Sequence, residues 1–193
     1  MGILDIEIVK GFMRMCNDGW LQGWHERNGG NLTYRMKEEE VAQCRPFFDP
    51  QPREWVNMGV QADNLAGEYF ITTGSGKFFR NVEPDPVHSI GIVEINDKGD
   101  SWRIVWGLEG GAKPTSELMK TYQAAIWVQH GLFTSGPDFD ITFGLAHTIE
   151  KSAEIYVKVL SMGGGIIRQT ITDDDLRAIA HDFGVTLNEK FLN

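Results

Sequence analysis

Residues 68–81, EYFITTGSGKFFRN, join a strand pattern to a glycine loop in the middle of the chain. Their first six residues are rich in aromatic and β-branched side chains, which predicts a strand. Residues 74–76, Gly-Ser-Gly, predict a tight turn where that strand ends. Residues 89–95 and 101–107 predict two more strands, and the Asn-Asp-Lys-Gly at 96–99 predicts a hairpin between them. The centre of the chain therefore predicts an antiparallel sheet.

Helical patterns lie on either side of these strands. Apolar residues recur at steps of three and four over residues 9–24, which predicts an amphipathic helix that ends at the loop of residues 28–31. A second apolar pattern over residues 139–160 predicts a long helix closed by the glycines at 163–165. Thr172, followed three residues later by an acid, predicts a capping box at the start of a last helix. Mixed helices and strands indicate the α/β class.

The remaining segments are shorter or irregular. Residues 32–36 and 124–128 predict two short strands, and the three glutamates at 38–40 predict a solvated face. Residues 45–67 contain three prolines and no periodic pattern, which predicts a long surface excursion within one domain. We find no internal repeat, so the whole chain of 193 residues is expected to form a single domain.

The composition restricts the partners of the chain. The net charge is −9 and the isoelectric point is near 5.0, so the chain has no electrostatic footprint for nucleic acid or an anionic membrane. The first residues carry acids where a signal peptide carries bases, and no apolar run approaches the length of a membrane span. Two cysteines form no disulfide or zinc pattern. We expect a cytoplasmic protein whose anionic ligands are bound by local groups.

Three small polar loops are candidates for binding such an anion. They contain Asn28, Gly30 and Asn31, then Ser75 and Gly76, and finally Thr115 and Ser116. Glycine allows backbone N–H groups to approach an anion closely, and the hydroxyl and amide side chains add donors. Each loop taken alone is more typical of an ordinary turn or helix end, and no Walker loop is present.

Two further residues could take part in chemistry. Glu117 follows the last of these loops, where a carboxylate is either a favourable helix start or a general acid/base beside the phosphate donors. His130 lies just after the strand predicted at 124–128, where a histidine is either structural or a metal ligand. The five histidines are scattered, and no two lie two or four positions apart, so no local pair can chelate a metal.

The order and flanks of these loops resemble the class II aldolase family, which includes sugar-phosphate aldolases, pentulose-phosphate epimerases and the adducin head domain. The similar stretches are residues 20–33 (WLQGWHERNGGNLT), 72–82 (TTGSGKFFRNV), 107–118 (GLEGGAKPTSEL) and 130–164. The resemblance implies a three-layer α/β fold in which helices flank a central, mostly antiparallel sheet. It also implies a homotetramer that takes a small sugar phosphate.

The resemblance implies roles for the candidate residues by position. The phosphate cradle would consist of Asn28, Gly30, Asn31, Ser75, Gly76, Thr115 and Ser116. Glu117 matches the catalytic glutamate, and His130 matches the last of three histidines that bind zinc. Within the family, the first two stretches look like those of members that cleave L-rhamnulose 1-phosphate to dihydroxyacetone phosphate and L-lactaldehyde. The expected cofactor is therefore Zn²⁺, which acts as a Lewis acid in this family.

One part of the family pattern is missing from this chain. The family has a His-x-His pair between the loop of Glu117 and the strand that leads to His130, whereas residues 118–129 contain no histidine. The resemblance implies that several tens of residues are missing, with the join near 118–120. We therefore expect weakened zinc binding and an incomplete sheet. The alternatives are a catalytically inactive binding or assembly module on the same fold, and a related aldolase or epimerase.

Overall fold

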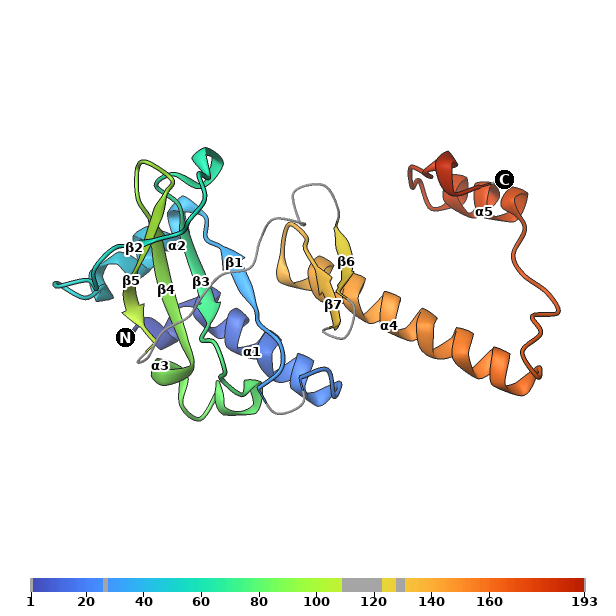
Figure 1. The fold of residues 1–193 in the computed structure, drawn as a ribbon, viewed down its shortest axis with the longest axis horizontal. Coiled ribbons are helices and arrows are strands. Elements are labelled where there is room, and N and C mark those ends of the chain that lie inside the picture. Colours follow the sequence, from blue (N-terminus) through green and yellow to red (C-terminus); the bar gives the residue numbers. More distant parts are fainter. Residues whose placement is uncertain (1, 26–27, 109–122, 128–130, 193) are drawn as a thin grey trace. The chain divides into compact units, whose positions relative to one another are not determined.

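The computed structural model describes residues 2–25, 28–108, 123–127 and 131–192. It divides into two compact units, residues 1–145 and residues 146–193, and each is described by itself. Figure 1 shows the elements along the chain. The expected Thr115, Ser116, Glu117 and His130 lie outside the described residues, as does the predicted join near 118–120.

A five-stranded antiparallel sheet forms the centre of the first unit. Its strand order is β1-β3-β4-β5-β2. The strands are β1 (Thr33–Arg35), β2 (Val56–Asn57), β3 (Tyr69–Thr73), β4 (Ile90–Ile95) and β5 (Ser101–Gly107). The four strands predicted at 32–36, 68–73, 89–95 and 101–107 are therefore confirmed. The hairpin predicted at 96–99 joins β4 to β5, and Asn96 closes it by accepting the backbone N–H groups of Asp100 and Ser101.

Helices cover one face of this sheet. Helix α1 (Glu7–Leu21) buries Val9, Phe12 and Cys16 against side chains such as Ile71 and Ile92. These helical residues lie on one stripe because they recur at steps of three and four. The predicted helix was too long at its carboxyl end, since α1 stops at Leu21 and Gly23 follows with a φ of +76°.

The acidic run at 38–40 opens a second short helix, α2 (Glu38–Cys44), and is more than the solvated face predicted from its charge. Its glutamates occupy the first turn, where carboxylates favour the helix dipole. Val41 and Cys44 point inward and join the same core as α1. Helix propensity and two apolar anchors together explain the helix.

The predicted irregular excursion covers the opposite face of the sheet, a role that the sequence did not indicate. Met58 and Leu65 pack on Ile95, Trp102 and Ile104. Apart from β2, the described part of this excursion contains only two short 3-10 turns, Arg45–Phe47 and Asp63–Leu65. The sheet thus separates a helical layer from an irregular layer, while the flanking of both faces by helices stays an expectation. A four-residue helix, α3 (Pro86–Ser89), leads directly into β4.

Strands β6 (Ala124–Trp127) and β7 (Gly131–Thr134) form a separate two-stranded antiparallel sheet. The strand predicted at 124–128 is present, but in the described residues it pairs only with β7. The side chain of Ile126 is 76% exposed. This division agrees with the expectation of an incomplete central sheet.

Helix α4 (Phe139–Met162) follows, and its first turn packs within the first unit. The ring of Phe139 lies 4.8 Å from that of Tyr34 and 6.1 Å from that of Phe12. The helix ends before glycines that adopt positive φ, +65° at Gly164 and +87° at Gly165. The predicted helix and its glycine stop are both confirmed.

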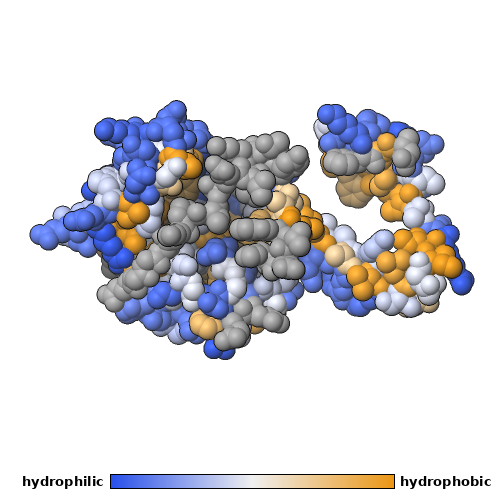
Figure 2. Space-filling view, viewed as in Figure 1, coloured by the Kyte–Doolittle hydropathy of each residue, from blue (hydrophilic) through white to orange (hydrophobic). Residues whose placement is uncertain are grey.

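The second unit contains the rest of α4 and helix α5 (Asp173–Asp182). The predicted capping box is present, because the hydroxyl of Thr172 accepts the backbone N–H of Asp175 while the carboxylate of Asp175 accepts that of Thr172. Figure 2 shows hydrophobic surface on this unit. The exposed apolar side chains include Ile155, Tyr156, Val157, Met162, Ile166, Ile171 and Phe183.

Candidate functional site

Two of the predicted phosphate loops meet at one end of the five-stranded sheet, the lower end in Figure 1. Residues 28–31 lead into β1, and residues 74–76 follow β3. Because β1 and β3 are antiparallel and Thr33 pairs with Thr72, the start of one strand lies beside the end of the other. The topology therefore brings together loops that are more than 40 residues apart in sequence.

Three threonines fasten the two loops to each other. The hydroxyl of Thr73 accepts the backbone N–H of Leu32 at 3.0 Å, and the hydroxyls of Thr33 and Thr72 lie 2.9 Å apart. Thr73 is only 2% exposed, so its hydroxyl is held by this contact in the absence of bulk water. Asn31 directly precedes Leu32, so this hydrogen bond anchors the backbone next to Asn31.

Glycine is needed where the loops approach one another. Gly30 has a φ of +101° and Gly76 a φ of +73°, conformations that favour glycine. A Cβ built on Gly76 would lie 3.7 Å from Nδ2 of Asn28, so the amide of Asn28 reaches the second loop. Asn28, Gly30, Asn31, Ser75 and Gly76 are all exposed to solvent, as a ligand site requires.

The chain leaves β5 at this same end of the sheet. Gly107 pairs with Gly91 at the start of β4, next to the end of β3. Leu108 then adopts a φ of +47° and is 1% exposed. Its side chain packs so closely on Gly74 and Gly91 that a Cβ on either would come within 2.8 Å of it. Leu108, the last described residue before position 123, thus packs beside the second loop.

His25 is a residue of this region that the sequence patterns did not single out. Its ring stacks on Phe79 with centroids 3.9 Å apart, and its Nδ1 lies 3.2 Å from the carbonyl oxygen of Gly29. Burial lowers the pKa of His25 below its ordinary value, and the contact with Gly29 opposes this shift. The imidazole is therefore neutral near pH 7. The signal that could have drawn attention to it is its place in the stretch 20–33, five residues before Gly30.

Basic side chains lie beside the second loop, and they provide the local positive charge that an acidic chain needs in order to bind an anion. The stem of Lys77 folds over Gly74, with its Cγ 2.9 Å from the position of a Cβ there. The guanidinium of Arg80 lies 5.1 Å from the centre of the Phe78 ring and is exposed. Both side chains follow Ser75 within five residues. They supply positive charge near the exposed loop against the net charge of −9.

The donor set does not fit a zinc site held by three histidines. Among the described residues, no group of three histidine, cysteine or acidic side chains could hold a metal ion. His130 is the single expected ligand that the sequence retains. A catalytic zinc site generally needs three protein ligands.

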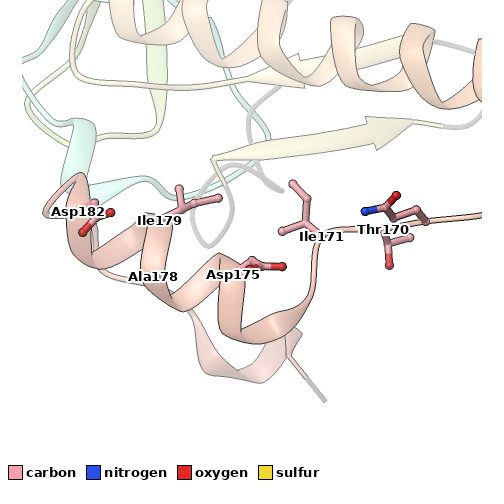
Figure 3. Close-up of a pocket in the computed structure, with 7 residues that line it drawn as sticks. Thr170, Ile171, Asp175, Ala178, Ile179 and Asp182 are labelled. Carbon is pink, nitrogen blue, oxygen red and sulfur yellow. The ribbon is translucent and has the colours of Figure 1, made fainter.

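The structure also has hollows that are lined by other residues. Figure 3 shows one on the second unit, which is lined by Thr170, Ile171 and residues of α5 that include Asp175, Ile179 and Asp182. A second is lined by residues from β1, α2 and the start of β3, including Arg35, Lys37 and Arg45. Neither contains a residue of the predicted site. Within the described part of the chain, no helix is long and apolar enough to cross a membrane.

The fold is that of sugar-phosphate aldolases. A crystal structure of a sugar-phosphate aldolase from Thermotoga maritima superimposes with a TM-score of 0.58 at 18% identity, covering 78% of this chain and 94% of that one. At this identity the likeness concerns the fold alone. No protein-family model matches the chain.

Sequence relatives define the family more narrowly. A rhamnulose-1-phosphate aldolase from Klebsiella pneumoniae is 33% identical over 265 aligned positions, which cover 95% of each chain. The enzymes of that name from Escherichia coli O157:H7 and Salmonella paratyphi B are also 33% identical, and the alignments cover 94% and 96% of their lengths. The chain therefore belongs to the rhamnulose-1-phosphate aldolase family.

The alignments also bear on the missing segment. They extend over 260 to 266 positions, whereas this chain has 193 residues. Since nearly all of both chains is covered, the relatives contain several tens of positions that have no counterpart here. The alignments do not place these positions along the chain, so an internal deletion near 118–120 stays a prediction.

Proposed function

We propose that this chain is an aldolase that cleaves L-rhamnulose 1-phosphate to dihydroxyacetone phosphate and L-lactaldehyde in rhamnose breakdown. The observation that supports this most strongly is the meeting of two glycine loops at one sheet end, in a chain from this family. Backbone N–H groups and short polar side chains of such loops suit a phosphate group. We assign the phosphate to Asn28, Gly30, Asn31, Ser75 and Gly76, together with Thr115 and Ser116.

In the proposed reaction Glu117 is the group that moves the proton. Cleavage removes the proton of the hydroxyl on the carbon that becomes the aldehyde. The electron pair of the broken carbon–carbon bond stays on the carbon that belongs to the dihydroxyacetone phosphate fragment. This carbon then takes up a proton. The phosphate loops hold the substrate so that this carbon stays within reach of Glu117.

A further part of the proposal concerns the binding of zinc. In the class II aldolases that the chain resembles, the metal stabilises the negative charge left by bond cleavage. Here only His130 is assigned to it, so we derive no step through the metal. We expect zinc to bind this chain much more weakly than a site with three histidines does.

The test is cleavage of L-rhamnulose 1-phosphate by the purified chain, with and without added zinc, followed through released dihydroxyacetone phosphate. Turnover that falls to background in a Glu117→Gln variant supports the aldolase. A folded chain that releases no dihydroxyacetone phosphate under either condition overturns it.

The absent His-x-His pair favours a second candidate, a catalytically inactive binding or assembly module on the same fold. Metal analysis separates the two: zinc bound at one equivalent, and lost in a His130→Ala variant, argues against the inactive module. An epimerase is a third possibility, and a pentulose phosphate offered as substrate tests it.

We also propose the larger organisation that the resemblance implies. Residues 1–193 would form one class II aldolase domain by descent, with three layers and a deletion near 118–120. The assembly would be a homotetramer in the cytoplasm, with a sugar phosphate as its partner and neither nucleic acid nor membrane. Sedimentation of the purified chain tests the tetramer.

A further inference from the structure

His25 occupies a position between three parts of the first unit. One edge of its ring faces the backbone of α1, where a Cβ built on Gly19 would lie 2.9 Å from Cδ2 and 3.0 Å from Nε2. One ring face stacks on Phe79 at an interplanar angle of 31°. The remaining side faces the loop of residues 28–31. The imidazole is thus wedged between a helix, an aromatic ring and a loop.

The loop leaves less room beside the ring than α1 does. A Cβ on Gly30 would overlap with Nδ1 of His25 and lie 2.7 Å from Cε1. Gly30 therefore has to be glycine for two reasons, its φ of +101° and the presence of this ring. The carbonyl of Gly29 can only accept a hydrogen bond, so Nδ1 of the neutral imidazole must carry the hydrogen. This contact fixes the tautomer of His25 as well as the orientation of its ring.

Phe79 extends the contact to the second loop. It is 3% exposed and begins a 3-10 turn, Phe79–Asn81, three residues after Gly76. The ring of His25 is packed between these groups, and a close-packed interior leaves little room for adjustment. A change in the position of the ring is therefore passed on to the neighbouring backbone. Movement of His25 would therefore shift residues 28–31 directly and residues 74–76 through Phe79.

We propose that His25 is a positioning residue that keeps the loops of residues 28–31 and 74–76 at the spacing at which both bind the substrate phosphate. This inference rests on the proposed function, which assigns those loops to the phosphate. His25 itself touches neither the reacting carbons nor the proton in this proposal. Its effect is on binding, since the reaction steps are assigned to Glu117.

The experiment compares the full-length chain with three variants at position 25 and one control. His25→Ala removes both ring and donor, His25→Phe keeps a ring on Phe79, and His25→Asn keeps a donor where Nδ1 lies. His181→Ala is the matched control, because His181 is an exposed histidine on α5 in the second unit. Affinity for inorganic phosphate is measured by calorimetry, and KM and kcat with L-rhamnulose 1-phosphate.

We expect His25→Ala to weaken phosphate binding and raise KM about tenfold, with a much smaller change in kcat, because misplaced loops bind the phosphate poorly. His25→Phe and His25→Asn should each recover part of the loss, and the control should match the parent chain. A folded His25→Ala chain with unchanged phosphate affinity overturns the proposal. If His25→Ala does not fold, the proposal is overturned by unchanged phosphate affinity in both His25→Phe and His25→Asn.

Two readouts separate this inference from the proposed aldolase. A parent chain that binds phosphate but does not turn over refutes the aldolase, while the phosphate affinities of the variants still decide the role of His25. A parent chain that binds no phosphate overturns the role assigned to His25, while turnover still decides the aldolase. Nitrogen NMR of the labelled imidazole gives a check without substrate: we expect hydrogen on Nδ1, and a resonance pattern with hydrogen on Nε2 only contradicts the geometry.

Discussion

Single residues decide how closely the two glycine loops approach. Gly30 is constrained both by its own backbone and by the ring of His25, whereas Gly23 has a similar positive φ of +76° and no atom within 4 Å of a built Cβ. The two positions therefore separate backbone strain from steric overlap. Gly23 provides a matched control for substitution at Gly30.

We expect Gly23→Ala to destabilise the chain by about 1–2 kcal/mol, the usual effect of a left-handed backbone on a residue with a side chain. Gly30→Ala should destabilise it by more, and should also weaken phosphate binding, because the new methyl group displaces His25. Urea denaturation and phosphate calorimetry measure both effects. Equal losses of stability in the two variants would contradict the contact between Gly30 and His25.

The pKa of His25 makes the stability of the folded chain depend on pH. Burial lowers this pKa in the folded chain, so as pH falls below the ordinary value of 6.5 the unfolded chain takes up the proton first. The contribution of the neutral ring to stability is therefore present above pH 6.5 and is lost as pH falls through the lower pKa of the folded state.

We expect the free energy of unfolding to fall less steeply below pH 6.5 in His25→Phe than in the parent chain, since phenylalanine takes up no proton. Urea denaturation at a series of pH values measures the difference. Parallel curves for the two proteins would show that the histidine is not held neutral.

Among the elements, the strands of the central sheet are tied together by a row of side chains. Tyr69 on β3 donates its hydroxyl to Glu94 on β4 at 2.6 Å, and Arg103 on β5 donates Nε to the same carboxylate at 2.6 Å. The register places these three residues side by side. Burial raises the pKa of Tyr69, and the hydrogen bond to Glu94 adds to that shift.

We expect Glu94→Gln to destabilise the chain by about 1–3 kcal/mol, because two donors lose a charged acceptor. The pKa of Tyr69 should fall toward its ordinary value in this variant. Denaturation and phenolate absorbance measure the two effects. Glu83→Gln, at an exposed glutamate, is the control and should leave both unchanged.

For the whole molecule, the second unit presents more apolar side chains to solvent than a monomer usually tolerates. Met162 is 88% exposed, Phe183 78% and Ile155 55%. Such surface favours association, which is in keeping with the proposed tetramer.

We expect the chain to associate at micromolar concentrations, and Ile155→Lys with Met162→Lys to shift it toward the monomer. Analytical ultracentrifugation measures the change. Val60→Lys, at an apolar residue 49% exposed in the irregular excursion, is the control. A parent chain that stays monomeric throughout, or a control that dissociates equally, would refute the role of α4.

The sequence by itself determined most elements and the family. Apolar steps of three and four placed α1 and α4, and runs of strand-forming residues placed β3 to β5. Thr172 marked the start of α5, because all these signals act over a few neighbouring residues. The loops that contain Asn28 and Ser75 were also recognisable. Helix α2 was missed, since its charge masked two buried anchors.

Only the tertiary structure decided what depends on contacts between distant segments. The pairing of Thr33 with Thr72 brings the two loops to one sheet end, and the pairing of β6 with β7 separates the last strands from the main sheet. The wedge formed by His25 between Gly19, Gly30 and Phe79 has no local pattern. Such contacts arise from the packing of elements far apart in sequence, which no short stretch of residues specifies.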